Sequence, residues 1–213
     1  MAPIRWLLHV QGLRRLSQIT CGLFPALRAL SMSRKVTVDG FICPGHVSVI
    51  TGTRPYETFV ERYKKPCVIT GFDDDDIVQG ITRLVKQIQS GDHKVEIEYK
   101  RAVKPDGNVA ARKMVDRVFK AVDSEWRGLG IIKKSGLKIR TEYTQFDAEQ
   151  EFDFPFVRPA RHAGCRCGDV LQGIINPVQC KLFRNKCTPQ RPVGPCMVST
   201  EGTCAAYYKY GEM

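Results

Sequence analysis

Long apolar runs are missing from this sequence of 213 residues, and no stretch approaches the roughly 18 consecutive apolar residues that a membrane-spanning helix needs. Histidine is scarce, with four residues in all, and none lies close to another along the chain. Acidic residues are absent from the first 35 positions, which hold six Arg and Lys. These shortages predict a protein without membrane association and argue against a zinc site built on a close histidine pair.

The net charge of +11 comes from the two ends of the chain. Residues 36–155 hold 19 basic and 19 acidic groups, whereas residues 156–213 hold eight basic and three acidic groups. A nucleic-acid-binding face needs clustered Lys and Arg, so the neutral centre predicts no nucleic-acid partner. The basic ends leave such a face as the alternative, although positive charge also offsets the negative charge of a thiolate-bound metal centre.

The first 35 residues are rich in Arg, which is a feature of organellar transit peptides. Arg14 and Arg15 interrupt the apolar run and argue against a secretory signal. We favour a surface helix, or a start displaced into unrelated coding sequence. Cys21, Cys43 and Cys67 stand alone in apolar settings, as reduced core cysteines do, so we expect a cytoplasmic protein.

Strand and helix patterns alternate through the centre of the chain. The patterns predict strands at 36–43, 67–72 and 95–99, and helices at 55–63, 77–88 and 109–122. The four acids at 73–76 suit the N-terminus of the second helix, with a magnesium site as the less favoured alternative. The alternation predicts an α/β fold with an open, largely parallel sheet. Ligands of such sheets bind at the carboxyl ends of the strands, where PGHVS, read as a loop, and the GF-DDDD junction lie.

The character of the sequence changes near Pro155, where Pro, Gly and Cys become frequent and periodicity weakens. Such a segment needs a covalent or metal staple to stay folded. Six of the nine cysteines fall within the last 49 residues: Cys165, Cys167, Cys180, Cys187, Cys196 and Cys204.

The spacing of these six cysteines leaves three roles open. Structural zinc usually requires two close C-x2–4-C pairs, whereas only one close pair, of C-x-C type, is present. Iron–sulfur clusters accept wider spacings, and disulfides suit exported proteins. We rank a cluster first, zinc second and disulfides third. A cluster needs four thiolates, so two thiols remain either for exchange chemistry or as ordinary buried side chains.

Several longer stretches resemble the HypD family of hydrogenase maturation factors: FICPGHVSVITGT, SEWRGLG, CGDVLQG and QCKLFRNKCTPQRPVGPCMVSTEGTCAAYYKYG. The resemblance runs from about Pro25 to the C-terminus. It implies an unmatched extension at 1–24, the family's second α/β domain at 25–155, and a cysteine-rich 4Fe-4S domain at 156–213.

The resemblance also implies a function. HypD-like proteins take part in assembling the Fe(CN)2CO centre of nickel–iron hydrogenases, as redox-active scaffolds rather than stand-alone enzymes. The implied partners are a HypC-type chaperone and a HypE-type cyanide donor that works with HypF. A zinc-stapled protein-interaction module without redox activity is the alternative.

The family pattern assigns roles to particular residues of this chain. It implies that Cys167, Cys180, Cys187 and Cys204 bind the iron of a 4Fe-4S cluster, and that Cys165 and Cys196 form a redox pair. It also places His46 in a cleft, where it would donate to bound cyanide or act as an acid, although a helix-capping role is equally consistent with its position. Ser48 and Glu125 are weaker cleft candidates, and Trp126 is expected in the core.

One departure from the family is plain. Full-length HypD-like proteins carry CGGHT, GPGCPVC and GFETT motifs, and none of these occurs here. We therefore expect a truncated or split form in which the iron-assembly site is absent or incomplete.

Overall fold

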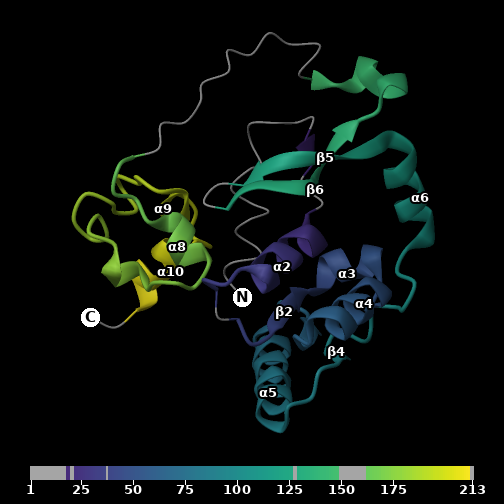
Figure 1. Cartoon of the computed structure of the whole chain (residues 1–213), viewed down its shortest axis with the longest axis horizontal. Helices are drawn as coiled ribbons and strands as arrows, with labels where there is room; N and C mark the ends of the chain where they lie inside the picture. The colour runs from purple at the N-terminus through teal and green to yellow at the C-terminus, as the bar shows by residue number, and fades with distance from the viewer. Residues whose placement is uncertain (1–17, 20–21, 37, 127–128, 149–161, 212–213) are drawn as a thin grey trace. The chain divides into compact units, whose positions relative to one another are not determined.

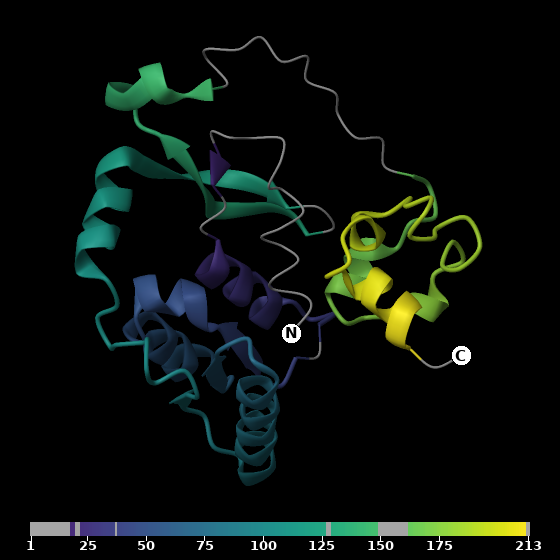
Figure 2. The same ribbon diagram turned by 180° about the vertical axis from the view of Figure 1, so that it is seen from behind.

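The computed structural model of the chain describes residues 18–19, 22–36, 38–126, 129–148 and 162–211. The expected domain boundary at 155 and nearly all of the expected extension at 1–24 fall outside these residues. The chain divides into two compact units, shown from opposite sides in Figures 1 and 2. The first unit comprises Leu23–Ser33 and Val38–Phe119, and the second contains Lys120 and the described residues that follow it.

A parallel three-stranded sheet forms the centre of the first unit, as the strand–helix alternation predicted. Strand β2 (Phe41–Pro44) pairs in parallel with β3 (Cys67–Thr70), which pairs in parallel with β4 (Val95–Ile97). Every residue of β3 is buried, because this strand is central and covered on both faces. The carboxyl ends of the three strands therefore meet at one edge of the sheet.

Helices connect and flank these strands: α2 (Leu23–Met32), α3 (Gly45–Thr51), α4 (Arg54–Tyr63), α5 (Asp74–Ser90) and α6 (Val109–Val118). Helix α4 confirms the helical spacing from Pro55, with Pro in its first turn. The interpretation of PGHVSVITG as a loop was wrong, since Gly45–Thr51 forms α3 directly after β2. Pro44 and Gly45 indicated a turn there, but the contacts of Ser48 support a short helix directly after the strand.

Helix α5 forms as its apolar spacing predicted, but the face that it buries is not its most apolar face. Gly80 and Gln87 are buried, and a side chain at Gly80 would collide with Thr70 of β3. By contrast Ile81, Val85 and Ile88, three residues of the predicted apolar stripe, are 46%, 44% and 41% exposed. The small residue lets the helix approach the sheet, so the contact face is set by close packing rather than by the most hydrophobic side chains.

The second unit contains a further three-stranded sheet, which lies outside the strands predicted at 36–43, 67–72 and 95–99. Strand β1 (Gln18–Ile19) pairs antiparallel with β6 (Gly130–Ile139), and β5 (Phe119–Trp126) lies on the other side of β6. The helix predicted at 109–122 ends at Val118, and the residues from Phe119 onward, including the cleft candidate Glu125, belong to β5 instead. Trp126 is 1% exposed and donates its indole hydrogen to Ser135 Oγ at 2.6 Å, which confirms its predicted place in the core.

The cysteine-rich part of the second unit is built from short helical turns. They are α8 (Cys167–Leu171), η2 (Pro177–Gln179), α9 (Pro195–Val198) and α10 (Thr203–Tyr210), whereas η1 (Thr141–Phe146) precedes this part of the chain. Figures 1 and 2 both show α8, α9 and α10 gathered in one small lobe. Among the described helices, none is long and apolar enough to cross a membrane.

Candidate functional site

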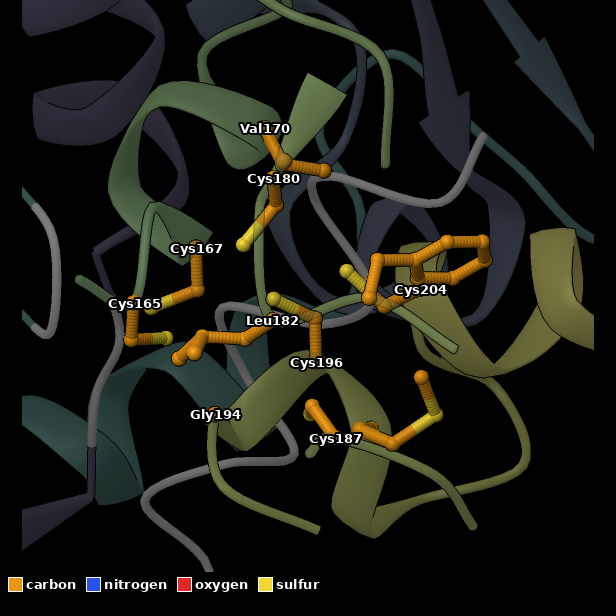
Figure 3. A pocket seen from close by; sticks show the side chains of 11 residues that line it. Cys165, Cys167, Val170, Cys180, Leu182, Cys187, Gly194, Cys196 and Cys204 are labelled. Atoms are coloured by element: carbon orange, nitrogen blue, oxygen red, sulfur yellow. The ribbon is translucent and has the colours of Figure 1, made fainter. Parts of the chain in front are cut away.

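All six cysteines of the C-terminal segment line one cavity. Figure 3 shows their side chains together, although they come from five different places in the chain. Cys167 begins α8, Cys180 ends the η2 turn, Cys196 is the second residue of α9, and Cys204 is the second residue of α10. Cys165 precedes α8, and Cys187 lies in the loop after η2. The short helices thus bring distant thiols to one point.

The rest of the cavity wall is apolar. The cavity has a volume of about 20 Å3, and the side chains that complete its lining are Val170, Leu182, Phe183 and Met197, with Gly194 at one side. Within the described part of the chain, no carboxylate or imidazole belongs to this lining. Four of the thiols are buried, whereas Cys165 and Cys167 are partly exposed. A ligand held here would therefore meet soft sulfur donors in a water-poor setting.

The thiols are close enough to interact with one another. Cys165 forms a hydrogen bond with Cys167, which together with burial raises the pKa of the Cys165 thiol. Cys196 lies within hydrogen-bonding reach of Cys167 and Cys204, and these contacts, with burial, raise the pKa of Cys196. The same contact with Cys196 lowers the pKa of Cys204. Cys204 is therefore the readier thiolate, and Cys196 the thiol that keeps its proton.

Cys187 also receives a hydrogen bond from the backbone. The Val193 amide donates to Cys187 Sγ at 3.3 Å, an interaction that stabilises a thiolate. The next residue, Gly194, allows a close approach of Cys165, because a Cβ atom at this position would lie 2.6 Å from Cys165 Sγ. Sequence reasoning assigned no role to Val193 or Gly194, although the GPC motif contains the glycine.

The donor set fits an iron–sulfur cluster. Such a cluster takes four thiolates, and the cavity offers six with no competing hard ligand in its lining. Among the described residues, no group of three or more His, Cys, Asp or Glu is gathered tightly enough for a single metal ion. The division into four ligands and two exchange thiols remains a prediction.

The predicted cleft residues of the first unit lie at the carboxyl ends of the parallel strands. His46 follows β2 in the first turn of α3, and its ring is exposed. It contacts Phe72, which follows β3, with ring centroids 4.3 Å apart. Ser48 is fully buried and makes hydrogen bonds of 2.8 Å with Pro44 O and with the Tyr56 hydroxyl, so its role is structural.

Two further residues at this edge escaped sequence reasoning. The Tyr99 ring packs against Gly45 and Gly71, where an added Cβ would lie 2.7 and 2.9 Å from ring carbons. The Arg101 guanidinium stacks 4.3 Å from the centre of the Tyr99 ring and pairs with Asp73 and Asp76 at 3.2 and 3.1 Å.

The acids at 73–76 therefore do lie at the N-terminal end of α5, where their charge complements the helix dipole. Asp73 makes no side-chain capping hydrogen bond, however. Its carboxylate and that of Asp76 bind Arg101 instead. The acid run thus anchors the segment after β4 to the start of α5.

The fold and the site define a chain that combines a parallel α/β unit with a small unit built round a cavity of six thiols. The family model HypD, described as the hydrogenase formation hypA family, matches residues 11–211. The chain belongs to this family, which confirms the resemblance found in the sequence.

Curated relatives agree with the family match. The chain is 50% identical over 177 residues to the hydrogenase maturation factor HypD of Cupriavidus necator, a match that covers 83% of this chain and 47% of that protein. It is 43% identical over 194 residues to HypD of Escherichia coli, covering 88% of this chain and 51% of that protein. The chain thus spans about half the length of the curated relatives it matches.

Proposed function

We propose that this chain supplies the thiol-rich half of a hydrogenase maturation factor of the HypD type. In this role it holds a 4Fe-4S cluster through Cys167, Cys180, Cys187 and Cys204. It acts as a redox-active scaffold in assembly of the Fe(CN)2CO centre, rather than as a stand-alone enzyme. Its partners are a HypC-type chaperone and a HypE-type cyanide donor that works with HypF.

The observation that carries the proposal is the convergence of six cysteines on one otherwise apolar cavity. Six reduced thiols that face one cavity are suited either to binding one soft metal centre or to reacting with one another. The lowered pKa of Cys204 and the amide hydrogen bond to Cys187 both favour thiolates, the form that binds metal. The family match supplies the biological setting.

Cys165 and Cys196 are proposed as the exchange pair. Both belong to one network of sulfur contacts, in which each lies within hydrogen-bonding reach of Cys167. A bound cluster supplies or accepts single electrons, whereas a thiol pair releases two electrons and two protons when its disulfide forms. Cys165 is the more accessible of the two, so it is the thiol that a reacting partner would meet first.

His46 is proposed as the contact for the cyanide-bearing substrate. Its exposed ring lies at the carboxyl end of β2, the edge where parallel sheets bind ligands. There its imidazole can donate a hydrogen bond to a cyanide nitrogen or deliver a proton. The chain spans about half the length of its relatives, and we expect this step to involve the part of such a protein that the chain does not cover.

Metal analysis after anaerobic purification and reconstitution tests the proposal. We expect four iron and four sulfide per chain, with the broad visible absorbance of a 4Fe-4S cluster that bleaches on reduction. Stoichiometric zinc without iron or sulfide would instead favour the zinc-stapled interaction module. The Cys180→Ala and Cys196→Ala variants, compared under the same conditions, then separate ligands from exchange thiols.

A further inference from the structure

Arg184 has an unusual backbone conformation within the thiol-bearing loop. It lies between Cys180 and Cys187, and its φ of 59° falls in the left-handed region. Residues other than glycine adopt this region at a cost and keep it where their surroundings hold them there. The contacts of Arg184 must therefore stabilise the turn.

The Arg184 side chain supplies those contacts by reaching across to the end of α10. Its Nη2 donates hydrogen bonds to the carbonyl oxygens of Tyr208 at 3.2 Å and Gly211 at 3.5 Å. The same guanidinium lies 5.4 Å from the centre of the Tyr208 ring and 5.6 Å from that of Phe183. A cation at a helix C-terminus is favourable because it meets unpaired carbonyls and the negative end of the helix dipole.

Both segments that Arg184 joins belong to the thiol cavity. The backbone amide of Arg184 donates to Cys187 O at 3.2 Å, which closes the turn next to that thiol. Phe183, the preceding residue, lines the cavity and packs its ring against Tyr207 and Tyr208 of α10 at 6.2 and 6.0 Å. Helix α10 in turn carries Cys204 in its first turn.

We propose that Arg184 is a positioning residue that fastens the loop of Cys180 and Cys187 to α10, so that these thiolates keep their places relative to Cys204. Arg184 acts through Phe183 and the end of the helix and takes no part in electron transfer itself. The inference rests on the proposed function for its link to cluster binding. The fastening of the loop is a property of the polypeptide and is testable without any metal.

Three substitutions separate the backbone from the side chain. Arg184→Ala removes the side-chain contacts and keeps the unfavourable φ, whereas Arg184→Gly removes the contacts and relieves the backbone. Arg184→Lys keeps the charge without the planar fork and should restore part of the effect. Lys186→Ala is the matched control, because Lys186 is an exposed cation in the same loop.

In the reconstituted full chain, the rate of iron loss to a chelator should rise in both the Ala and the Gly variants, by about ten-fold to a hundred-fold, the range found for groups that orient metal ligands. Lys186→Ala should match the wild type, and Arg184→Lys should fall between. If Arg184→Gly holds its cluster as long as the wild type, the side-chain contacts do not matter and the proposal is wrong.

A metal-free measurement keeps the two proposals apart. In the apo chain, alkylation followed by mass spectrometry gives the reactivity of each cysteine relative to Cys165. Arg184→Ala and Arg184→Gly should both raise the reactivity of Cys187 and Cys204, and Lys186→Ala should not. A wild-type chain that binds no iron defeats the proposed function, while unchanged alkylation in both Arg184 variants defeats the positioning role.

Discussion

Replacing Ser48 with alanine should destabilise the first unit rather than abolish a chemical step. Ser48 belongs to the PGHVS stretch, yet it is fully buried, and its hydroxyl joins Pro44 O to the Tyr56 hydroxyl with two contacts of 2.8 Å. Tyr56 is also fully buried. Ser48→Ala therefore leaves the Tyr56 hydroxyl without this partner in a dry interior.

The expected cost follows from the hydrogen bonds that are lost. A buried polar group left without its partner costs about 1–3 kcal/mol. The Thr51 side chain is also within hydrogen-bonding reach of Tyr56, so the loss should be near the lower end of that range. Tyr56→Phe in the Ser48→Ala background removes the stranded hydroxyl, and the coupling energy between the two changes should be at least about 0.5 kcal/mol.

Tyr56 adds a pH dependence whose direction is determined by its surroundings. Burial raises the pKa of Tyr56 well above its ordinary value, and the nearby Cys43 thiol adds to this. The unfolded state therefore loses this proton first, and the stability that Tyr56 contributes is complete below about pH 10 and declines as the pH rises above it. Tyr56→Phe should remove this part of the alkaline loss of stability.

Hydrogen exchange of the β2 and β3 amides measures this stability for the first unit alone. Ser48→Ala should lower the opening free energy of these amides, with the exchange of the β6 amides as the internal control. A loss of hydrogenase maturation without any change in amide exchange would refute the structural reasoning and return Ser48 to the list of cleft residues.

Three shorter predictions concern the cavity and the surface. Cys180→Ala should abolish cluster binding and destabilise the cysteine-rich part, because metal binding and folding are coupled in small units. Cys196→Ala should retain iron. Equal iron loss in both variants would contradict the division into four ligands and two exchange thiols. Gly194→Ala should displace Cys165 and lower the free energy of unfolding by about 1–3 kcal/mol through overpacking. The displacement should appear as a changed alkylation rate of Cys165. An unchanged rate would mean that the cavity accommodates the added methyl group without moving Cys165. Val85→Gln on the exposed face of α5 should change stability by less than about 0.5 kcal/mol, and a larger loss in thermal unfolding would show that this face is covered.

Local sequence patterns predicted the α/β unit well. Helical spacing from Pro55 and β-branched runs at β3 and β4 are short-range signals, and the structure confirms the elements they indicated. Trp126 was correctly placed in the core because a large aromatic side chain is seldom left exposed.

Other features depended on contacts between residues far apart in the chain. Helix α3 was missed because Pro44 and Gly45 read as a turn, whereas the following residues are held by the buried hydroxyl of Tyr56. Apolar spacing predicted helix α5 but does not reveal which face approaches the sheet, and Ile81, Val85 and Ile88 are exposed. Tyr99 and Arg101 carried no motif, and they reach the strand ends only because β4 lies beside β3.

The sequence by itself determined the family, the alternation of strands and helices, and the gathering of six cysteines in the last 49 residues. These properties depend on residue identity and short spacing, which the chain carries in any conformation. Only the tertiary structure decided that all six thiols share one apolar cavity, that Cys204 is the readier thiolate, and that Arg184 ties the loop of Cys180 and Cys187 to α10. Each of these depends on burial and on distances between segments, which arise only when the short helices pack together.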